Sequence, residues 1–299
     1  MWDLLKQDLH KGHIKALART ISLIENEKEG YDEFLLGLSV PSVPVIGITG
    51  PPGAGKSTLT DALIGTIVAT GKKVAVLCVD PSSPFNLGAV LGDRIRMSDW
   101  YDHPLVYIRS LATRGSMGGL HPKILEIADL CKVAGYDYVI VETVGVGQSE
   151  IEITGLADVT IVVLVPEAGD EIQTMKAGLM EIADIFVVNK SDRPDAHIFM
   201  KHLRSMLAPA FHKKNTEIPI IRTVALRKEG VDELWSATLA FLSSGKYHQQ
   251  KSYLLAEKAY YLISREKMKD LSKEMLREAI VSEMERSDFN IYRFTERYH

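Results

Sequence analysis

The chain has 299 residues, of which 46% are apolar and 25% are charged, and its formal net charge is -4. Such a chain buries a sizeable core and forms one or two globular domains. The slight excess of acidic residues gives no reason to expect binding to nucleic acid or to an anionic membrane. Any anion that the protein binds is therefore expected to be held by a local site.

The start of the sequence, MWDLLKQDLHKGHIKAL, contains charges and histidines and lacks the uninterrupted apolar region of a secretory signal. Apolar runs such as VTIVVLV are far shorter than the about 20 residues of a membrane helix. Cys78 and Cys131 lie far apart in apolar surroundings, which favours buried thiols over a disulfide or a metal pair. These features predict a soluble cytoplasmic protein.

Residues 1–42 contain no β-rich run, and their apolar side chains recur at helical spacing. The pattern predicts an N-terminal helical segment of one or two helices packed on the core. The apolar positions are Leu4, Leu5, Leu9, Ile14, Leu17, Ile21 and Ile24.

Residues 43–245 alternate short β-branched runs with segments of helical spacing. Most of these runs are apolar on both faces, which is typical of parallel strands covered by helices. We therefore predict an α/β fold with a doubly wound, mostly parallel sheet whose ligands bind at the carboxyl ends of the strands. The predicted strands are 43–49, 73–79, 105–110, 136–143, 159–165, 185–189 and 218–224.

Residues 246–299 are rich in Lys, Arg and Glu, and they form the predicted C-terminal helical arm. Apolar side chains recur at helical spacing at Met268, Leu271, Met275 and Ala279. Two interpretations stay open: a helix that packs this stripe on its own domain, or a dimerising arm.

The run GPPGAGKST begins where an apolar strand is expected to end and a helix to begin, and it fits the pattern G-x-x-x-x-G-K-[ST]. Its glycines let consecutive backbone N–H groups point at phosphate oxygens, beside the positive end of the following helix. Lys56 adds a charge for the β and γ phosphates, and Ser57 a hydroxyl for Mg²⁺. The alternative is a glycine turn without a ligand. The candidate phosphate-binding residues are Gly50, Pro51, Pro52, Gly53, Ala54, Gly55, Lys56, Ser57 and Thr58.

The run VVNKSD ends the predicted strand at 185–189. Asp192 can accept hydrogen bonds from N1–H and from the exocyclic amine of guanine, a pair of donors that adenine lacks. The stem of Lys190 can lie over the base, and Asn189 can brace the surrounding loops. The motif therefore predicts GTP or GDP as the ligand; the alternative for Asp192 is a helix N-cap.

Three acids lie at or after the ends of predicted strands: Asp80 at the end of the second, Asp93 in the loop after it, and Glu142 at the end of the fourth. Because the carboxyl ends of parallel strands meet at one edge, these side chains are expected near the phosphates, where Mg²⁺ takes one or two acids directly or through water. A cap or turn role is the alternative for each. Gly145 and Gly147 make the following loop a candidate nucleotide switch.

These residues resemble the MeaB/ArgK family of P-loop GTPases, chaperones of adenosylcobalamin-dependent methylmalonyl-CoA mutase and related acyl-CoA mutases. The resemblance extends over about residues 44–245, with similar helical flanks. The runs that carry it are GPPGAGKST, VDPSSPFNLGAVLGDRIRM, RSLATRGSMGGL, VETVGVGQSE, PEAGDEIQTMKAG and VVNKSD.

The resemblance implies a SIMIBI-type G domain, a homodimer held largely by the C-terminal arm, and GTP hydrolysis coupled to loading or protection of cobalamin on the mutase. It further implies that Val224, Ala225 and Leu226 close over the base, and that residues 167–178 form a switch that senses the partner. Val224 departs from the family by replacing a serine, and Leu87 and Ala89 replace small or hydroxylated residues in the mobile loop.

Hydrolysis also needs a group that orients the attacking water. The candidate catalytic residues are Lys56, Glu142 and Gln148, with Arg94, Arg96 and Arg114 also available. Slow intrinsic turnover that a partner accelerates is therefore expected. Three rival functions are a metallochaperone GTPase, a transport-linked kinase and a nucleotide-binding scaffold; the sequence contains no H-x-x-x-H or C-x-x-C pair and no H-R-D run to favour the first two.

Overall fold

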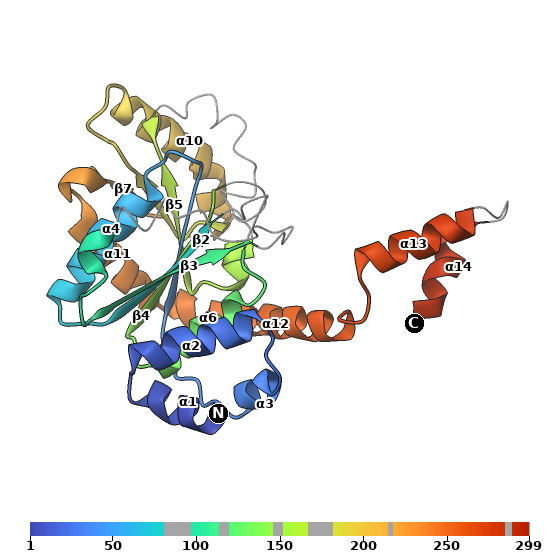
Figure 1. The fold of residues 1–299 in the computed structure, drawn as a ribbon. Helices are drawn as coiled ribbons and strands as arrows, with labels where there is room; N and C mark the ends of the chain where they lie inside the picture. Colours follow the sequence, from blue (N-terminus) through green and yellow to red (C-terminus); the bar gives the residue numbers. More distant parts are fainter. Residues whose placement is uncertain are drawn as a thin grey trace. The chain divides into compact units, whose positions relative to one another are not determined.

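The computed structural model describes residues 1–80, 97–113, 120–145, 152–166, 182–214, 218–284 and 289–298, with only the helical backbone described at 208–214 and 245–251. The chain divides into two compact units, Met1–Leu254 and Leu255–His299. Within the first unit, helices cover a parallel sheet (Figure 1).

The N-terminal segment forms three helices, α1 (Trp2–His10), α2 (Ile14–Glu25) and α3 (Tyr31–Leu36). The prediction of one or two helices was therefore wrong. The chain turns at Gly30, whose φ of 83° is left-handed and whose added Cβ would lie 2.8 Å from Nε1 of Trp2. This turn brings Phe34 against the Trp2 ring, with the ring centroids 4.8 Å apart, so the short third helix closes back on the first.

The seven predicted strands are all present, each within two residues of its expected bounds, and the prediction of an α/β parallel sheet is confirmed. Every pair of neighbouring strands is parallel, in the order β3-β2-β4-β1-β5-β6-β7. The strands are β1 (Val45–Thr49), β2 (Val74–Asp80), β3 (Val106–Ala112), β4 (Tyr138–Glu142), β5 (Val159–Leu164), β6 (Ile185–Val188) and β7 (Ile220–Arg222).

Helices bury both faces of the sheet (Figure 1). One face packs on α4 (Lys56–Ala69), α10 (Ala196–Lys214) and α11 (Val231–Leu242); the other packs on α1, α2 and α6 (Ile124–Val133). Successive residues of a strand enter opposite cores, as Val45 and Ile46 do, because side chains alternate along a strand. The predicted burial of both faces is confirmed.

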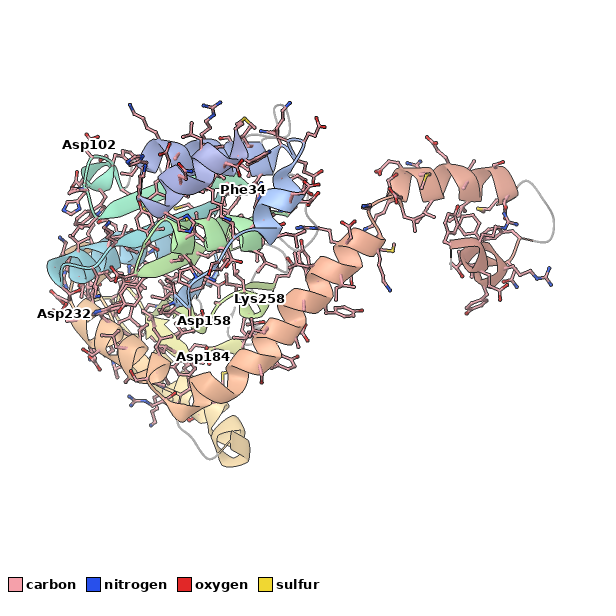
Figure 2. The ribbon with its side chains drawn as sticks, turned by 90° about the horizontal axis from the view of Figure 1, so that it is seen from below. Phe34, Asp102, Asp158, Asp184, Asp232 and Lys258 are labelled. Carbon is pink, nitrogen blue, oxygen red and sulfur yellow. The ribbon has the colours of Figure 1, made fainter. Side chains whose placement is uncertain are left out.

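Aspartates close the amino-terminal end of the sheet. Each one directly precedes a strand. Its carboxylate accepts a hydrogen bond from a backbone N–H at the start of a neighbouring strand or just before that strand. Two of them, Asp158 and Asp184, are labelled in Figure 2. These bonds join Val45 to Asp158 (2.8 Å), Thr160 to Asp184 (2.9 Å) and Lys73 to Asp137 (2.8 Å). These three aspartates therefore have structural roles. The acids at the carboxyl ends of the strands are the candidates for a functional role.

Short 3₁₀ turns complete the first unit: η1 (Ser98–Trp100), η2 (Ile153–Gly155) and η4 (Ala225–Arg227). Cys78 and Cys131 are buried and outside any disulfide, as predicted, and burial raises the pKa of the Cys131 thiol to about 12. No helix among the described residues is long and apolar enough to cross a membrane.

The C-terminal arm contains α12 (Gly245–Lys267), α13 (Lys273–Met284), α14 (Ile291–Thr295) and η5 (Glu296–Tyr298). The expected stripe on one helix is wrong, because Met268 and Leu271 fall in the turn between α12 and α13. The side chain of Met275 is 41% exposed, and α13 buries none of its residues. Beyond it, Asn290 caps α14 and the rings of Phe294 and Tyr298 pack together.

Candidate nucleotide-binding site

The loop between β1 and α4 contains glycines at positions where a side chain would clash with neighbouring residues. A Cβ on Gly50, whose φ is 140°, would lie 2.1 Å from the carbonyl oxygen of Val163 in β5. A Cβ on Gly55, whose φ is 87°, would lie 2.4 Å from Nδ2 of Asn189. The backbone therefore curls against two neighbouring elements at the carboxyl end of the sheet, a geometry that only glycine permits.

Lys56 is folded into this loop and its side chain is buried. Its ammonium donates to the carbonyl oxygens of Gly50 (2.9 Å) and Pro51 (3.2 Å). A Cβ on Gly145, after β4, would lie 2.4 Å from the same Nζ. Because Gly145 has no side chain, the ammonium has room at this position. The first turn of α4 follows Gly55 and has no side-chain cap. A cation and the positive end of a helix thus meet in one loop, as phosphate binding requires.

Glu142, at the end of β4, joins the first two turns of α4. Its carboxylate accepts hydrogen bonds from Ser57 (2.6 Å to Oε1) and Thr60 (2.9 Å to Oε2). Asp80 ends β2, where Cys78 lies opposite Glu142 in the parallel pair. Both acids are buried, Glu142 being 3% exposed. Hydroxyl and carboxylate oxygens are the ligands that Mg²⁺ prefers, so the chemistry of Ser57 and Glu142 fits this ion.

Asn189, after β6, connects the phosphate loop with the loop that follows β7. Its amide donates to the carbonyl oxygen of Ala54 (2.9 Å), while its Oδ1 accepts from the Thr223 hydroxyl and the Ala225 N–H, both at 3.1 Å. The predicted bracing by Asn189 is thereby observed. Lys190 has a left-handed φ of 53° and donates from Nζ to the carbonyl oxygen of Gly53 (2.8 Å), so its stem extends toward the phosphate loop.

Asp192 follows Lys190 by two residues, and 40% of its side chain is exposed. The alternative interpretation as a helix N-cap is wrong, because α10 begins only at Ala196. Of the residues expected to close over the base, Val224 and Ala225 are buried, whereas the side chain of Leu226 is 85% exposed. Oδ2 of Asp192 lies 3.3 Å from Nη1 of Arg227.

Sequence reasoning missed two partners in this site. Thr60 follows Ser57 by three residues and so lies on the same helical face, a spacing that could have identified it. Arg227 had no comparable signal. Several candidates lie outside the described residues: Asp93, Gln148, Gly147, Arg94, Arg96, Arg114, Leu87, Ala89 and the whole segment 167–178.

A glycine loop around a buried lysine, a serine beside an acid and an N-K-x-D loop bonded to the glycine loop define a P-loop GTPase on a parallel sheet. The chain belongs to the MeaB family: the sequence model described as "Methylmalonyl Co-A mutase-associated GTPase MeaB" matches residues 17–284. The family binds GTP and GDP, and the protein is a GTP hydrolase. The predicted resemblance is confirmed.

Relatives support this assignment over most of their length. GTPase ArgK of Escherichia coli is 39% identical over 256 residues, which cover 81% of this chain and 77% of the relative. A Pyrococcus horikoshii protein with the provisional name of a GTPase is 45% identical over 262 residues, covering 86% and 81%. The solved structure titled "LAO/AO transport system kinase" is 27% identical, with a TM-score of 0.69, and covers 99% of this chain and 96% of its own.

Proposed function

We propose that this protein is a Mg²⁺-dependent GTPase that acts as a chaperone of an adenosylcobalamin-dependent acyl-CoA mutase of the methylmalonyl-CoA mutase type. In this proposal GTP hydrolysis is coupled to loading or protection of cobalamin on the mutase. The observation that carries the link to a mutase is the family match over residues 17–284, because the family description names the association with methylmalonyl-CoA mutase.

The phosphate end of the site is assigned to the loop from Gly50 to Thr58. Lys56 already directs its ammonium at the carbonyl oxygens of this loop, so a phosphate would compete for a cation that is in position. Ser57 and Glu142 would hold Mg²⁺, with Asp80 and Asp93 as further acids. The bound ion would neutralise phosphate charge.

The base end is assigned to Asn189, Lys190 and Asp192, with Val224, Ala225 and Leu226 beside them. Asn189 supports this assignment, since it ties the phosphate loop to the loop at Ala225 through a single buried amide. The residues assigned to the phosphates and those assigned to the base are thus connected through Asn189. Asp192, being partly exposed, is available to accept the two donors of guanine.

For the chemical step, Lys56, Glu142 and Gln148 remain the candidates. The described residues near Lys56 bind its ammonium and include a carboxylate. None of these described residues offers a group that plainly orients a water molecule. We therefore expect slow turnover by the protein alone. A partner that orders the loops around the site would accelerate it.

We further propose a homodimer held by the C-terminal arm, and a division of the chain into 1–42, 43–245 and 246–299. Exposed apolar side chains on the arm support the dimer: Met275, Val281 and Met284 are 41%, 57% and 64% exposed in α13. A stable monomer rarely leaves such a series uncovered. Sedimentation of the full chain tests this part separately.

The test is release of inorganic phosphate from GTP in Mg²⁺, by the full chain alone and with a purified methylmalonyl-CoA mutase. Lys56→Ala is the blank, because it removes the phosphate-directed charge. We expect slow release that rises about tenfold or more with saturating mutase. Unchanged release at saturating mutase would contradict the chaperone proposal. Because one solved relative is titled a kinase, phosphate transferred to a protein instead of to water would favour that second function.

A further inference from the structure

The guanine-reading carboxylate has a neighbour whose role the motif does not explain. Arg227 lies at the end of η4, directly after the residues assigned to the base. Its Nη1 is 3.3 Å from Oδ2 of Asp192. The two residues are 35 positions apart in sequence, so the contact depends on the fold.

Arg227 is itself held from the other side. Its Nε and Nη2 donate to Oε1 and Oε2 of Glu229 at 2.7 and 3.4 Å, which is a two-point contact. The loop is closed by a backbone bridge in which Val224 N–H donates to Glu229 O (3.1 Å) and Glu229 N–H donates to Val224 O (3.3 Å). Glu229 thus fixes the direction in which Arg227 reaches Asp192.

The contact leaves most of the acceptor capacity of Asp192 available. Arg227 meets one oxygen through one N–H, whereas Oδ1 of Asp192 accepts no hydrogen bond from any residue that the structure describes. A carboxylate has about four lone-pair directions, so one can be used for alignment and others for a base. Val224 offers no side-chain donor, and within this closed loop Arg227 is the residue whose side chain donates to Asp192.

We infer that Arg227, aligned by Glu229, is a positioning residue that sets the orientation of the Asp192 carboxylate for guanine. The inference rests on the proposed role of Asp192. The opposite arrangement, in which Arg227 blocks the carboxylate, would require the arginine to leave when nucleotide binds, and the two-point contact with Glu229 opposes such a movement.

The test measures the affinities of GDP and of inosine 5′-diphosphate by calorimetry on the full chain. The inosine nucleotide keeps N1–H but lacks the exocyclic amine, so it uses only part of the Asp192 carboxylate. For Arg227→Ala we expect GDP affinity to fall roughly two- to fivefold, as for an exposed ion pair, and inosine diphosphate affinity to fall less.

Arg222→Ala is the matched control, because Arg222 is exposed and its side chain makes no hydrogen bond or ion pair with the described residues. It should leave both affinities unchanged. Arg227→Lys keeps the charge but not the fork, so it should restore GDP affinity only in part. At about 1 M salt the difference between wild type and Arg227→Ala should shrink.

Equal losses for the two nucleotides, or no loss, would overturn the inference, and a gain in GDP affinity would establish the blocking arrangement instead. These outcomes leave GTP binding by the wild-type protein intact. Failure of the wild-type chain to bind GDP at all would overturn the assignment of the site, and the role of Arg227 with it.

Discussion

The hydroxyl of Ser57 lies 2.6 Å from Oε1 of Glu142, although 85 positions separate the two residues. Ser57 is in the first turn of α4 and Glu142 is the last residue of β4, so the contact joins the phosphate loop to the neighbouring strand. The second oxygen of Glu142 accepts from Thr60 on the same helix. One buried carboxylate therefore fixes the helix start and supplies negative charge where a cation would balance the phosphates.

Glu142→Gln should reduce GTP turnover and raise the Mg²⁺ concentration needed for half-maximal rate, each by about 10- to 100-fold. The amide keeps the shape of the side chain but loses the charge, and its NH₂ cannot accept from Thr60. Turnover measured across a Mg²⁺ titration checks this. Glu233→Gln, the same change at an exposed position of α11, is the control and should behave as wild type. Equal Mg²⁺ dependence of the two variants would argue against the assignment of Glu142.

Gly145→Ala should abolish nucleotide binding because its Cβ would lie 2.4 Å from Nζ of Lys56 and 2.6 Å from Gly50 O. Gly135→Ala is a matched control: φ is 84° there and 81° at Gly145, but no atom lies within 4 Å of the added Cβ. Both changes carry the left-handed cost of about 1–2 kcal/mol, and only the first displaces the lysine. GDP affinity and thermal unfolding of both variants separate the two effects. Similar GDP affinities would contradict this account of Gly145.

Asn189→Ala should lower the free energy of unfolding by about 2–4 kcal/mol and weaken GDP binding. It removes three hydrogen bonds from a buried site and leaves the Ala54 carbonyl and the Ala225 N–H without this partner. Denaturant unfolding of the full chain provides the measurement. Asn26→Ala removes one exposed hydrogen bond, to Ser22, and should cost less than about 1 kcal/mol. Comparable losses for the two variants would show that the bridge between loops adds no stability.

The carboxylate of Asp137 should make a small, pH-dependent contribution to stability. Burial alone raises its pKa, but the Lys73 N–H and the Lys72 ammonium outweigh burial and lower the pKa below its usual value of 3.8. A lowered folded-state pKa stabilises the protein above about pH 4, and this stabilisation is lost as the pH falls through the folded-state pKa. Asp137→Asn should therefore lose at most about 1 kcal/mol at pH 7, since solvent screens the pair, and the difference should vanish toward pH 2.

Unfolding titrations between pH 7 and pH 2 measure this difference. Asp102→Asn is the control, because Asp102 is exposed and forms no hydrogen bond or ion pair with the described residues (Figure 2). Its difference from wild type should stay near zero throughout. A difference for Asp137→Asn that grows as the pH falls would have the wrong sign for this account.

The sequence pattern predicted those parts of the molecule whose conformation depends on neighbouring residues in the sequence. Strands buried on both faces read as continuous apolar runs, and the phosphate loop needs glycine at fixed positions, so both could be predicted from sequence. The third N-terminal helix was missed because it forms when Phe34 packs on Trp2, a contact between distant residues. The arm was misread because Met268 and Met275 keep helical spacing across a turn that spacing cannot detect.

The same limit applies to the site. The chemistry of Lys56, Ser57 and Asp192 follows from residue type and motif, whereas the partners that orient them come from other segments. Glu142 was expected near the phosphates from its position at the end of a strand, but its bonds to Ser57 and Thr60 required the structure. Arg227 could not have been selected, since an exposed arginine near a glutamate is common in sequences.

We propose that this chain hydrolyses GTP at the loop between β1 and α4 and that Asp192 selects the base. The most direct measurement compares GTP and xanthosine 5′-triphosphate turnover by wild type and Asp192→Asn. Xanthine carries a carbonyl where guanine has the amine, so an asparagine amide can donate to it. We predict that the variant loses about 100-fold or more of its kcat/KM for GTP and gains activity with the xanthine nucleotide. Undiminished GTP preference in Asp192→Asn would show that another residue selects the base.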